Sequence, residues 1–546
     1  MPVAIAGGGP VGLMLALFLD RHGVPSVVFN VEPGVRQHPK GSTQNARTME
    51  HYRRLGFAPE VRRLGLPADH PTDVAYFTRF NAWELARLKM PSEAEKMTAR
   101  AGAASTDQVP EPIHRANQMY VERLIFEQAR RRPNITLRFG WQIERFEQDP
   151  AGVTVHAAPA GGGPGESWRA EYLAGCDGGR SFVRRALGIA YTGYETLKQA
   201  FFGGRMISTY LRAPTLYRDV LGNRRAFQYW VVNPELRTAM VPLNGVDEFL
   251  LWTRSDDEAL GPAAIADVLR RCVGAPVEVE VLGSYPWTAG VALHAERFGA
   301  GRVLLAGDAV HLFTPTGGFG MNTGVDDAAN LAWKLAAMVQ GWGGPRLLAS
   351  YETERKPIAI RNTGAARILA QSVGEVVVAA EIEQPTEAGE AARRQAGAFL
   401  ATFGEEFASL GVQLGARYDG SPIVVADGPA PADDIVAYTP TSVPGGRAPH
   451  LWLGPGRGPG SSLFDHFGIG FTLLQLGPTA TGVAPFEAAA RARGVPLAVL
   501  HVPDPAAQAL YGCALALIRP DQHVAWRGQD APADADRVLA TVTGAA

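Results

Sequence analysis

Cysteine, net charge and long apolar runs are all scarce in this sequence. Its 3 cysteines (Cys176, Cys272 and Cys513) are scattered, which excludes a CxxC pair and a zinc cluster, and we interpret each as a small buried residue in a reducing compartment. A balance of 52 Lys+Arg against 54 Asp+Glu leaves a net charge of −2, which favours neither nucleic acid nor a membrane as partner. No apolar run approaches the ~18 residues that a membrane-spanning helix needs. We therefore expect a soluble, cytoplasmic protein without a metal site, whose 546 residues form two to four domains.

The amino terminus carries a glycine pattern between two apolar strands. Residues 3–6 read as a strand, residues 7–12 follow the pattern G-x-G-x-x-G, residues 13–22 read as a helix and residues 26–29 as a second strand. This is the βαβ dinucleotide fingerprint, in which the glycines serve the turn, the close approach of a pyrophosphate and the packing of helix on strand. The residues predicted to contact the dinucleotide here are Gly7, Gly9, Pro10, Val11 and Gly12.

The residue that should hold the adenosine ribose departs from the usual pattern. In this fold an acidic side chain at the end of the second strand binds the ribose hydroxyls. Counted from Gly12, that position is Asn30, and Glu32 follows on the same face of the strand. An amide can both accept from and donate to ribose hydroxyls, so we favour Asn30 and keep Glu32 as the alternative.

A second glycine-rich loop lies within residues 302–330. An apolar strand (303–305) leads to Asp308, a Pro/Gly-rich loop follows at 315–320, and a helix opens at Asn322. A carboxylate at a strand end can hold the hydroxyls of a ribityl chain, and glycines let the backbone approach a flat ring. A helix N-terminus suits the negative charge that a reduced flavin places on its N1–C2=O edge. The stretch therefore predicts a flavin site.

A third motif, Gly-Cys-Asp-Gly-Gly-Arg-Ser at residues 175–181, completes a pattern of three. Motifs at positions 7, 177 and 308 in this order resemble those of the class A flavoprotein monooxygenases, the para-hydroxybenzoate hydroxylase-like aromatic hydroxylases. The resemblance implies FAD, with Lys40 and Arg47 near its phosphates and Gln118 hydrogen-bonded to it. A solvated helix charge is the alternative for Arg47, and a helix-cap amide for Gln118. Further FAD contacts implied by the family are Asp177, Asp308, Pro315, Gly318, Gly320, Met321 and Asn322.

The resemblance also implies a reaction. NADPH or NADH binds transiently, reduces the flavin and leaves, and O₂ then forms a C4a-hydroperoxide that hydroxylates a phenolic ring. Because the flavin does the chemistry, the protein must position it and keep water away. Pro315, at the bend of the loop, would face the oxygen side of the flavin and shape the catalytic site. The expected partner is a small phenolic substrate, and a homodimer is usual in the family.

The fold implied is α/β, a Rossmann-like FAD domain with an inserted β-sheet substrate domain and a C-terminal thioredoxin-like domain. We assign residues 1–185 and 286–365 to the FAD domain, with a less regular stretch near 70–115, and 186–285 to the substrate domain. Residues 366–440 are a helical segment and linker, and 441–546 the thioredoxin-like domain, which has no CxxC. Aromatic residues of the substrate domain could line a pocket for a flat ring or pack its core. The candidates are Phe201, Phe202, Tyr229, Trp230 and Trp252, of which we select Tyr229 and Trp252.

Other functions of the same fold remain open. A class A enzyme can perform Baeyer–Villiger insertion, or hydroxylate a polyketide or antibiotic. A different class is a flavin-binding regulatory subunit without turnover. The intact glycines of both loops argue against that class, because such loops bring backbone beside a ligand.

Overall fold

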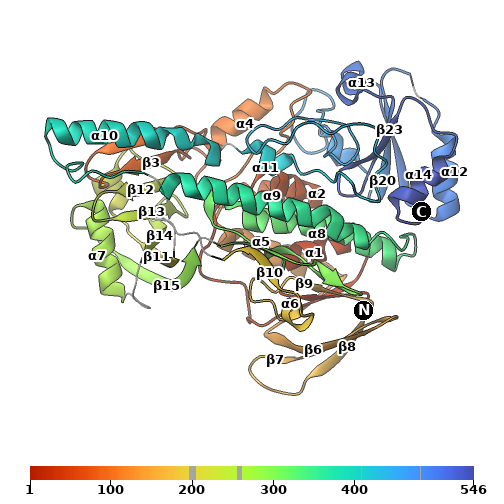
Figure 1. Cartoon of the computed structure of the whole chain (residues 1–546), viewed down its shortest axis with the longest axis horizontal. Helices are drawn as coiled ribbons and strands as arrows, with labels where there is room; N and C mark the ends of the chain where they lie inside the picture. Colours follow the sequence, from red (N-terminus) through yellow and green to blue (C-terminus); the bar gives the residue numbers. More distant parts are fainter. Residues whose placement is uncertain (196–203, 255–260, 290, 375, 408, 480) are drawn as a thin grey trace.

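The computed structural model describes residues 1–195, 204–254, 261–289, 291–374, 376–407, 409–479 and 481–546. Two sheet-based parts lie at opposite ends of an elongated molecule, and a nucleotide-type sheet lies between and below them (Figure 1). Phe201 and Phe202, named as pocket candidates, lie outside the described residues. Within the part of the chain that the structure describes, no helix combines the length and apolarity needed to cross a membrane.

The first sheet is built around the amino-terminal strand. Its order is β17-β18-β9-β1-β2-β5, and every pairing in it is parallel except that of β17 with β18. The helix α1 (Pro10–Arg21) begins three residues earlier than predicted, because proline is well suited to the first helical turn. The strands are β1 (Val3–Ala6), β2 (Ser26–Asn30), β5 (Ile135–Phe139), β9 (Tyr172–Gly175), β17 (Gly299–Ala300) and β18 (Val303–Leu305).

Helices and small sheets surround this core. Helix α1 is buried along nearly its whole length between the sheet and the long helix α8 (Phe319–Val339). Residues 160–165 join two strands of an antiparallel three-stranded sheet. The remaining elements of this part are α2 (Ala46–Leu55), α5 (Gln118–Arg130), α6 (Phe182–Ala186), β6 (Trp141–Asp149), β7 (Gly152–Pro159), β8 (Glu166–Ala170), β10 (Tyr191–Tyr194), β16 (Ala292–Ala295) and β19 (His311–Leu312).

The second large sheet has seven strands in the order β15-β11-β14-β13-β12-β3-β4. Two of these strands, β3 (Val74–Phe77) and β4 (Glu84–Leu88), come from the stretch near 70–115 that we expected to be an irregular part of the FAD domain. They join because β3 pairs in parallel with β12, with Tyr76 opposite Trp230. The other strands are β11 (Gly204–Arg212), β12 (Gln228–Val232), β13 (Arg237–Pro242), β14 (Glu248–Arg254) and β15 (Glu280–Ala289).

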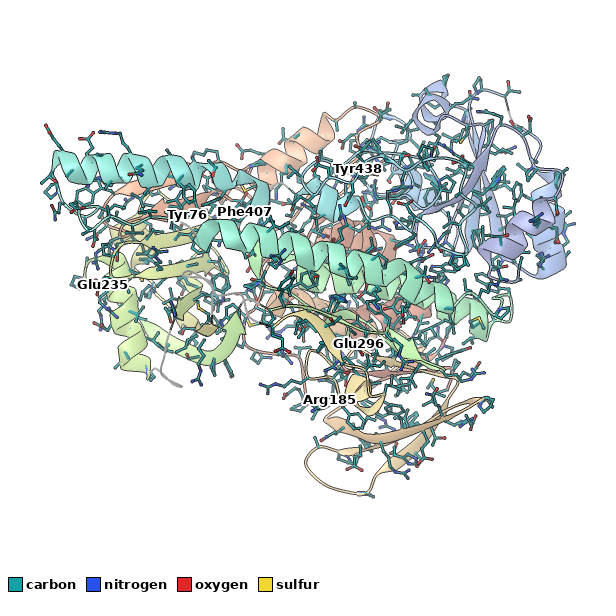
Figure 2. All side chains as sticks on the ribbon, viewed as in Figure 1. Tyr76, Arg185, Glu235, Glu296, Phe407 and Tyr438 are labelled. Atoms are coloured by element: carbon teal, nitrogen blue, oxygen red, sulfur yellow. The ribbon has the colours of Figure 1, made fainter. Side chains whose placement is uncertain are left out.

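The two faces of this sheet bury different side chains. One face packs against α7 (Pro262–Val273) through a cluster that includes Phe77, Tyr229 and Leu251. The other face packs through Tyr76 and Trp230 against Phe403 and Phe407. Tyr76 and Phe407 lie close together below the helix α10 (Glu387–Leu400) in Figure 2. Strand alternation thus sends neighbouring aromatic residues to opposite sides.

The C-terminal part contains a four-stranded sheet in the order β21-β20-β22-β23. Strands β20 and β21 are parallel, and β22 and β23 are antiparallel, which is a thioredoxin-like arrangement. The long helix α9 (Ala349–Gly374) runs across the middle of the molecule between this part and the seven-stranded sheet (Figure 1). The C-terminal elements are β20 (Phe471–Leu476), α12 (Ala484–Arg493), β21 (Leu497–Val502), α13 (Pro505–Tyr511), β22 (Leu515–Ile518), β23 (Val524–Gly528) and α14 (Ala535–Val542).

Candidate active site

The amino-terminal glycine loop has the geometry of a nucleotide-binding turn. Gly7 has φ +102°, and a Cβ atom built on it would lie 2.3 Å from the carbonyl oxygen of Cys176. A Cβ on Gly12 would lie 2.0 Å from the Gly7 carbonyl oxygen, so the helix could not approach the strand with a larger residue there. Around Gly9, by contrast, no atom lies within 4 Å of a built Cβ, and no side chain caps the helix N-terminus. The loop therefore offers open space and partial positive charge, which fits a pyrophosphate.

A cavity of about 560 Å³ extends from this loop. Its lining brings together the glycine loop, the end of β2, the start of α5 and the second glycine-rich loop. The predicted cofactor residues that line it are Gly7, Gly9, Pro10, Val11, Asn30, Glu32, Lys40, Gln118, Asp177, Asp308, Pro315, Gly318, Gly320 and Met321. Residues from three distant motifs thus share one surface.

The end of β2 gives Asn30 a structural task. The side-chain oxygen of Asn30 accepts a hydrogen bond from Gly8 N–H (3.0 Å), and its NH₂ group donates to the backbone oxygen of Glu32 (3.1 Å). Glu32 is exposed and lines the same cavity. The amide we favoured for the ribose therefore holds the glycine loop, and the geometry favours the carboxylate of Glu32 for the hydroxyls.

The second glycine-rich loop bends where two glycines adopt left-handed backbone. Gly317 has φ +77° and Gly318 has φ +66°, a region that disfavours other residues. Asp308 is exposed although the residues on both sides of it are buried, and its carboxylate and the ammonium of Lys40 attract each other. An exposed carboxylate beside a glycine turn fits the hydroxyls and flat ring of FAD.

Two predicted cofactor residues, Asp177 and Asn322, use their side chains differently from expectation. The carboxylate of Asp177 lines the cavity but accepts hydrogen bonds from Ser181 Oγ (2.5 Å) and Val183 N–H (3.1 Å), which caps α6. Asn322 lines neither this cavity nor the wider one described below. Its amide joins the loop that contains Thr43 to the second glycine-rich loop, by donating to the backbone oxygens of Thr43 (3.0 Å) and Gly318 (2.7 Å).

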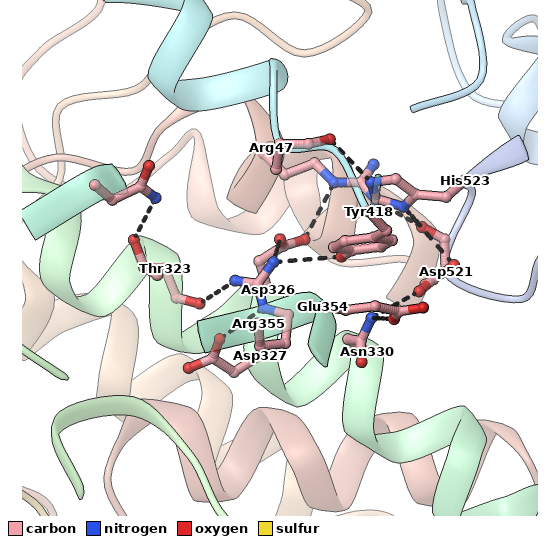
Figure 3. Close-up of polar contacts among 12 residues, drawn as sticks. Arg47, Thr323, Asp326, Asp327, Asn330, Glu354, Arg355, Tyr418, Asp521 and His523 are labelled. Atoms are coloured by element: carbon pink, nitrogen blue, oxygen red, sulfur yellow. Dashed lines mark hydrogen bonds and ion pairs between the residues drawn. The ribbon is translucent and has the colours of Figure 1, made fainter. Parts of the chain in front are cut away.

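Arg47 is the clearest correction. Its guanidinium lines neither cavity and is buried among acceptors: Glu50 (2.8 Å), Gln522 (2.7 Å) and the backbone oxygen of Asp521 (2.7 Å). Figure 3 shows it on the side of α8 that faces the C-terminal part. The positive residues that do line the cavity are Lys40, Arg36 and Arg180, and sequence reasoning missed Arg36. Its position four residues before Lys40, in the same loop, was the available signal.

A second, wider cavity of about 1470 Å³ adjoins the first. One of its walls is the seven-stranded sheet, where Trp230, Trp252 and Trp287 line it. Trp252 therefore lines a cavity, and its contact with a substrate stays a prediction. Tyr229 does not line this cavity, because it is completely buried on the opposite face, where its hydroxyl oxygen accepts from Ala226 N–H (2.7 Å).

The two cavities share part of their lining. Pro315 and Asp308 contact both, and so does Lys40. A ligand that extends from the glycine loop through the narrow cavity would reach the wide one at this junction. The other residues common to both cavities are Glu32, Gly34, Arg36, Gly41, Thr43, Phe313, Gly318 and Phe319.

The wide cavity also has polar walls. Glu248 Oε2 accepts hydrogen bonds from the hydroxyls of Tyr120 (2.9 Å) and Tyr210 (2.8 Å). Burial, together with the nearby Glu248, raises the pKa of both tyrosines, so they remain protonated. Nearby, His38 Nε2 lies 3.3 Å from Ser208 Oγ. Burial and Lys40 lower the pKa of His38 to about 4, which keeps its imidazole neutral near pH 7.

Family models match most of the chain. A model described as "FAD binding domain" matches residues 1–366, and one described as "Aromatic-ring hydroxylase, C-terminal" matches residues 441–546. Among curated relatives, the FAD-dependent monooxygenase apdD of Emericella nidulans is 32% identical, covering 99% of this chain and 90% of that protein. Aklavinone 12-hydroxylase RdmE of Streptomyces purpurascens is also 32% identical, covering 98% and 97%.

Solved structures agree over the full length. RebC with bound 7-carboxy-K252c superposes with a TM-score of 0.90 at 35% identity, covering 100% of this chain and 99% of that one. A ternary complex of aklavinone-11 hydroxylase with FAD and aklavinone gives a TM-score of 0.81 at 30% identity, with the same coverage. The resemblance to class A enzymes and the predicted fold are confirmed. The chain belongs to the class A flavoprotein hydroxylases and is a flavin-dependent monooxygenase that binds FAD.

Proposed function

We propose that this enzyme hydroxylates a polycyclic phenolic substrate, with NADPH or NADH as transient electron donor and O₂ as the oxygen source. FAD, when bound, supplies the redox chemistry and the activation of oxygen. The residues of this chain bind it, orient the substrate ring at the cavity junction and exclude water there. A homodimer, usual in the family, is part of the proposal and is tested by light scattering.

The placement of FAD follows from the cavity lining. We assign the pyrophosphate to the open backbone at Gly9 and to Lys40 and Arg36, and the adenosine ribose to Glu32. Asp308 binds the hydroxyls of the ribityl chain. The flat ring then reaches the junction at Pro315, a side chain without a titratable group that shapes the catalytic face.

The size of the wide cavity carries the proposed substrate class. Its volume is about 1470 Å³, whereas ordinary ligand pockets have ~300–1,000 Å³. We assign part of this space to the flavin ring and the rest to the substrate. A single-ring phenol would leave water beside the flavin, and water promotes wasteful release of H₂O₂. Several fused rings would fill the space between the indoles of Trp230, Trp252 and Trp287. RebC and aklavinone-11 hydroxylase, solved with 7-carboxy-K252c and aklavinone, match this chain along its length.

The polar wall specifies hydroxyl groups on that substrate. Tyr120 and Tyr210 direct their hydroxyl protons to Glu248, so each tyrosine oxygen offers only lone pairs to the cavity. These two hydroxyl oxygens can accept hydrogen bonds from groups that donate them. A phenolic hydroxyl is a donor of this kind, which supports a phenolic substrate.

The test is oxidation of NADPH and NADH by FAD-loaded protein with two sets of compounds. Fused-ring phenols, such as trihydroxyanthraquinones, should accelerate oxidation and gain one oxygen atom, whereas single-ring phenols should yield mainly H₂O₂. Product NMR separates ring hydroxylation from Baeyer–Villiger insertion, since both add the same mass. Efficient hydroxylation of single-ring phenols alone would contradict the proposed substrate class. Flavin-loaded protein inactive with every compound would favour the regulatory alternative.

A further inference from the structure

The turn between β22 and β23 is buried, although connecting turns ordinarily lie at the surface. Its residues Arg519 and Asp521 are each 1% exposed, and Gln522 is 2% exposed. Gln522 has φ +68° and is the one non-glycine residue with positive φ in the described part of the chain. A strained and buried turn needs strong contacts to hold it, and these come from the FAD domain.

Three FAD-domain helices bind this turn. Arg519 donates two parallel hydrogen bonds to Glu354 of α9 (2.6 and 2.8 Å). Asp521 Oδ2 accepts from Asn330 Nδ2 (3.1 Å) and Trp333 Nε1 (3.2 Å), both in α8. The backbone oxygen of Asp521 and the side chain of Gln522 accept from Arg47 of α2, 2.7 Å each.

The buried charged groups of this interface find partners in both parts. Burial opposes the charged forms of Glu354 and Asp521, but Arg519 outweighs it together with Lys334 at Glu354 and with His523 at Asp521. The pKa of Glu354 is therefore held at about 2 and that of Asp521 well below its usual range. Lys334 also contacts Glu354 (2.6 Å). Without the turn, Arg47 and Glu354 would each lose buried partners, at a high cost in free energy.

The same network continues along α8, where Figure 3 shows Arg355 in contact with Asp326 and Asp327. Arg355, next to Glu354, donates to Asp326 (2.5 Å) and to Asp327 (2.7 Å) of α8. Asp327 in turn accepts from Gly307 N–H (3.1 Å) and contacts His311 Nε2 (2.6 Å). Gly307 directly precedes Asp308, so the buried turn and the carboxylate that we assign to FAD belong to one connected set of contacts.

We infer that the Arg519–His523 turn of the C-terminal domain is a positioning element of the FAD site, coupled to the Gly307–Asp308 loop through Glu354, Arg355 and Asp327. This goes beyond a purely structural or dimer-forming role for the domain and rests on the proposed placement of FAD. Coupling between two sites is reciprocal. The turn therefore strengthens FAD binding, and FAD binding stabilises the turn.

Hydrogen exchange of the wild-type protein tests the second half of this statement. Apo and FAD-loaded protein are compared by mass spectrometry over residues 303–323 and 515–528. FAD should slow exchange in both segments, because local opening of the turn becomes coupled to loss of the ligand. Protection of 303–323 without protection of 515–528 would overturn the coupling. Absence of protection in 303–323 would instead contradict the proposed FAD placement.

Two variants test the first half. Asp521→Asn keeps the size of the side chain but removes its charge, and we expect FAD affinity to fall about 3- to 30-fold, measured by flavin fluorescence. The matched control is Asp465→Asn, since Asp465 pairs with Arg53 of α2 (2.6 Å) from the same domain but has no described link to α8. Both variants should lower the melting temperature of the apoprotein, and only Asp521→Asn should reduce the additional stabilisation by FAD.

A milder variant covers the case in which Asp521→Asn fails to fold. Arg519→Lys keeps the charge and loses the two-pronged contact with Glu354, so it should weaken FAD binding and shift the visible flavin spectrum to a smaller degree. FAD dissociation constants within twofold of wild type in every soluble Asp521 and Arg519 variant would overturn the inference, even if all of them melt at lower temperature.

Discussion

Individual glycines were predictable from the sequence because the contacts that require them belong to a short local motif. Gly7 and Gly12 meet backbone atoms within their own motif and its neighbour strand, so the pattern alone specifies them. Arg47 was not predictable in this way. Its partner Gln522 lies 475 positions away, and no local rule indicates that a helix cation will turn from a phosphate site towards another domain. Asn30 lines the narrow cavity and its side-chain oxygen already accepts from Gly8 N–H, so its contact with the ribose stays a prediction.

At the residue scale, Asp308 gives the most direct prediction for the cofactor. Asp308→Asn removes the charge that we assign to a hydroxyl of FAD. Loss of a charge-assisted hydrogen bond of ~1.5–3 kcal/mol should weaken FAD binding about 10- to 150-fold, measured by equilibrium ultrafiltration. The control is Asp267→Asn, an exposed aspartate of α7 paired with Arg271 (3.1 Å), which should leave FAD affinity unchanged. Full retention of FAD by the Asp308 variant would remove this residue from the site.

A second residue-scale prediction separates two aromatic residues on opposite faces of the seven-stranded sheet. Trp252→Ala should weaken binding of a fused-ring phenol about 10-fold or more, because it removes an apolar wall of the wide cavity. Tyr229→Phe should leave that binding unchanged. It removes the acceptor of the buried Ala226 N–H, which should lower the free energy of unfolding by ~1–3 kcal/mol. Quenching of tryptophan fluorescence and urea unfolding measure the two effects, and equal ligand affinities in both variants would contradict the assignment of the faces.

At the scale of elements, the positions of the strands were predictable, but their pairing partners and the directions of their faces were not. The apolar runs at 227–232, 238–243 and 249–252 correspond to β12, β13 and β14 within one or two residues. Both faces of this sheet are apolar, however, so a period of two could not tell which of Tyr229 and Trp230 faces the cavity. The pairing of β3 with β12 joins residues more than 150 positions apart, which no local pattern encodes.

The second glycine-rich loop is an element whose shape depends on backbone conformation. In Gly317→Ala, alanine would have to adopt the left-handed conformation of this glycine, at a cost of ~1–2 kcal/mol. Its Cβ would also lie 2.4 Å from the ring of Phe319, a residue that lines both cavities. We expect about 10-fold weaker FAD binding in isothermal titration. Gly161→Ala, in a loop with open space around it, is the control and should bind normally. An unaffected Gly317 variant would show that the loop adjusts without cost.

At the scale of the whole molecule, the sequence predicted a separate C-terminal domain without CxxC chemistry but not how that domain docks. The turn residues 519–523 look like an ordinary polar hairpin connection in the sequence. Their burial depends on complementary charges that α2, α8 and α9 present together only after folding. Contacts of this kind, formed between segments far apart in the sequence, make the FAD domain and the C-terminal domain a single electrostatic unit.

Buried histidines in two parts of this unit predict how its stability depends on pH. Burial, aided by Arg54 and Arg21, lowers the pKa of His22 to about 3. Burial also lowers the pKa of His450 to about 3, against the opposing hydrogen bond to the Asp107 carbonyl. Both should titrate near ~6.5 in the unfolded chain. Below that pH the unfolded state binds protons that the folded state excludes, so stability must decrease as pH falls from about 6.5 towards 3.

Each of these histidines should make the free energy of unfolding change by up to about 1.4 kcal/mol per pH unit. This change begins near pH ~6.5, about two pH units above the range in which carboxylates such as Glu354 become protonated in the unfolded chain. Urea unfolding between pH 5 and 8 measures it. His22→Gln should reduce the slope by roughly one proton, whatever it does to stability at pH 8. The same substitution at the half-exposed His156 controls for loss of an imidazole as such. A free energy of unfolding that stays constant between pH 5 and 7 would contradict this prediction. It would show that these imidazoles also bind protons in the folded protein, despite their burial.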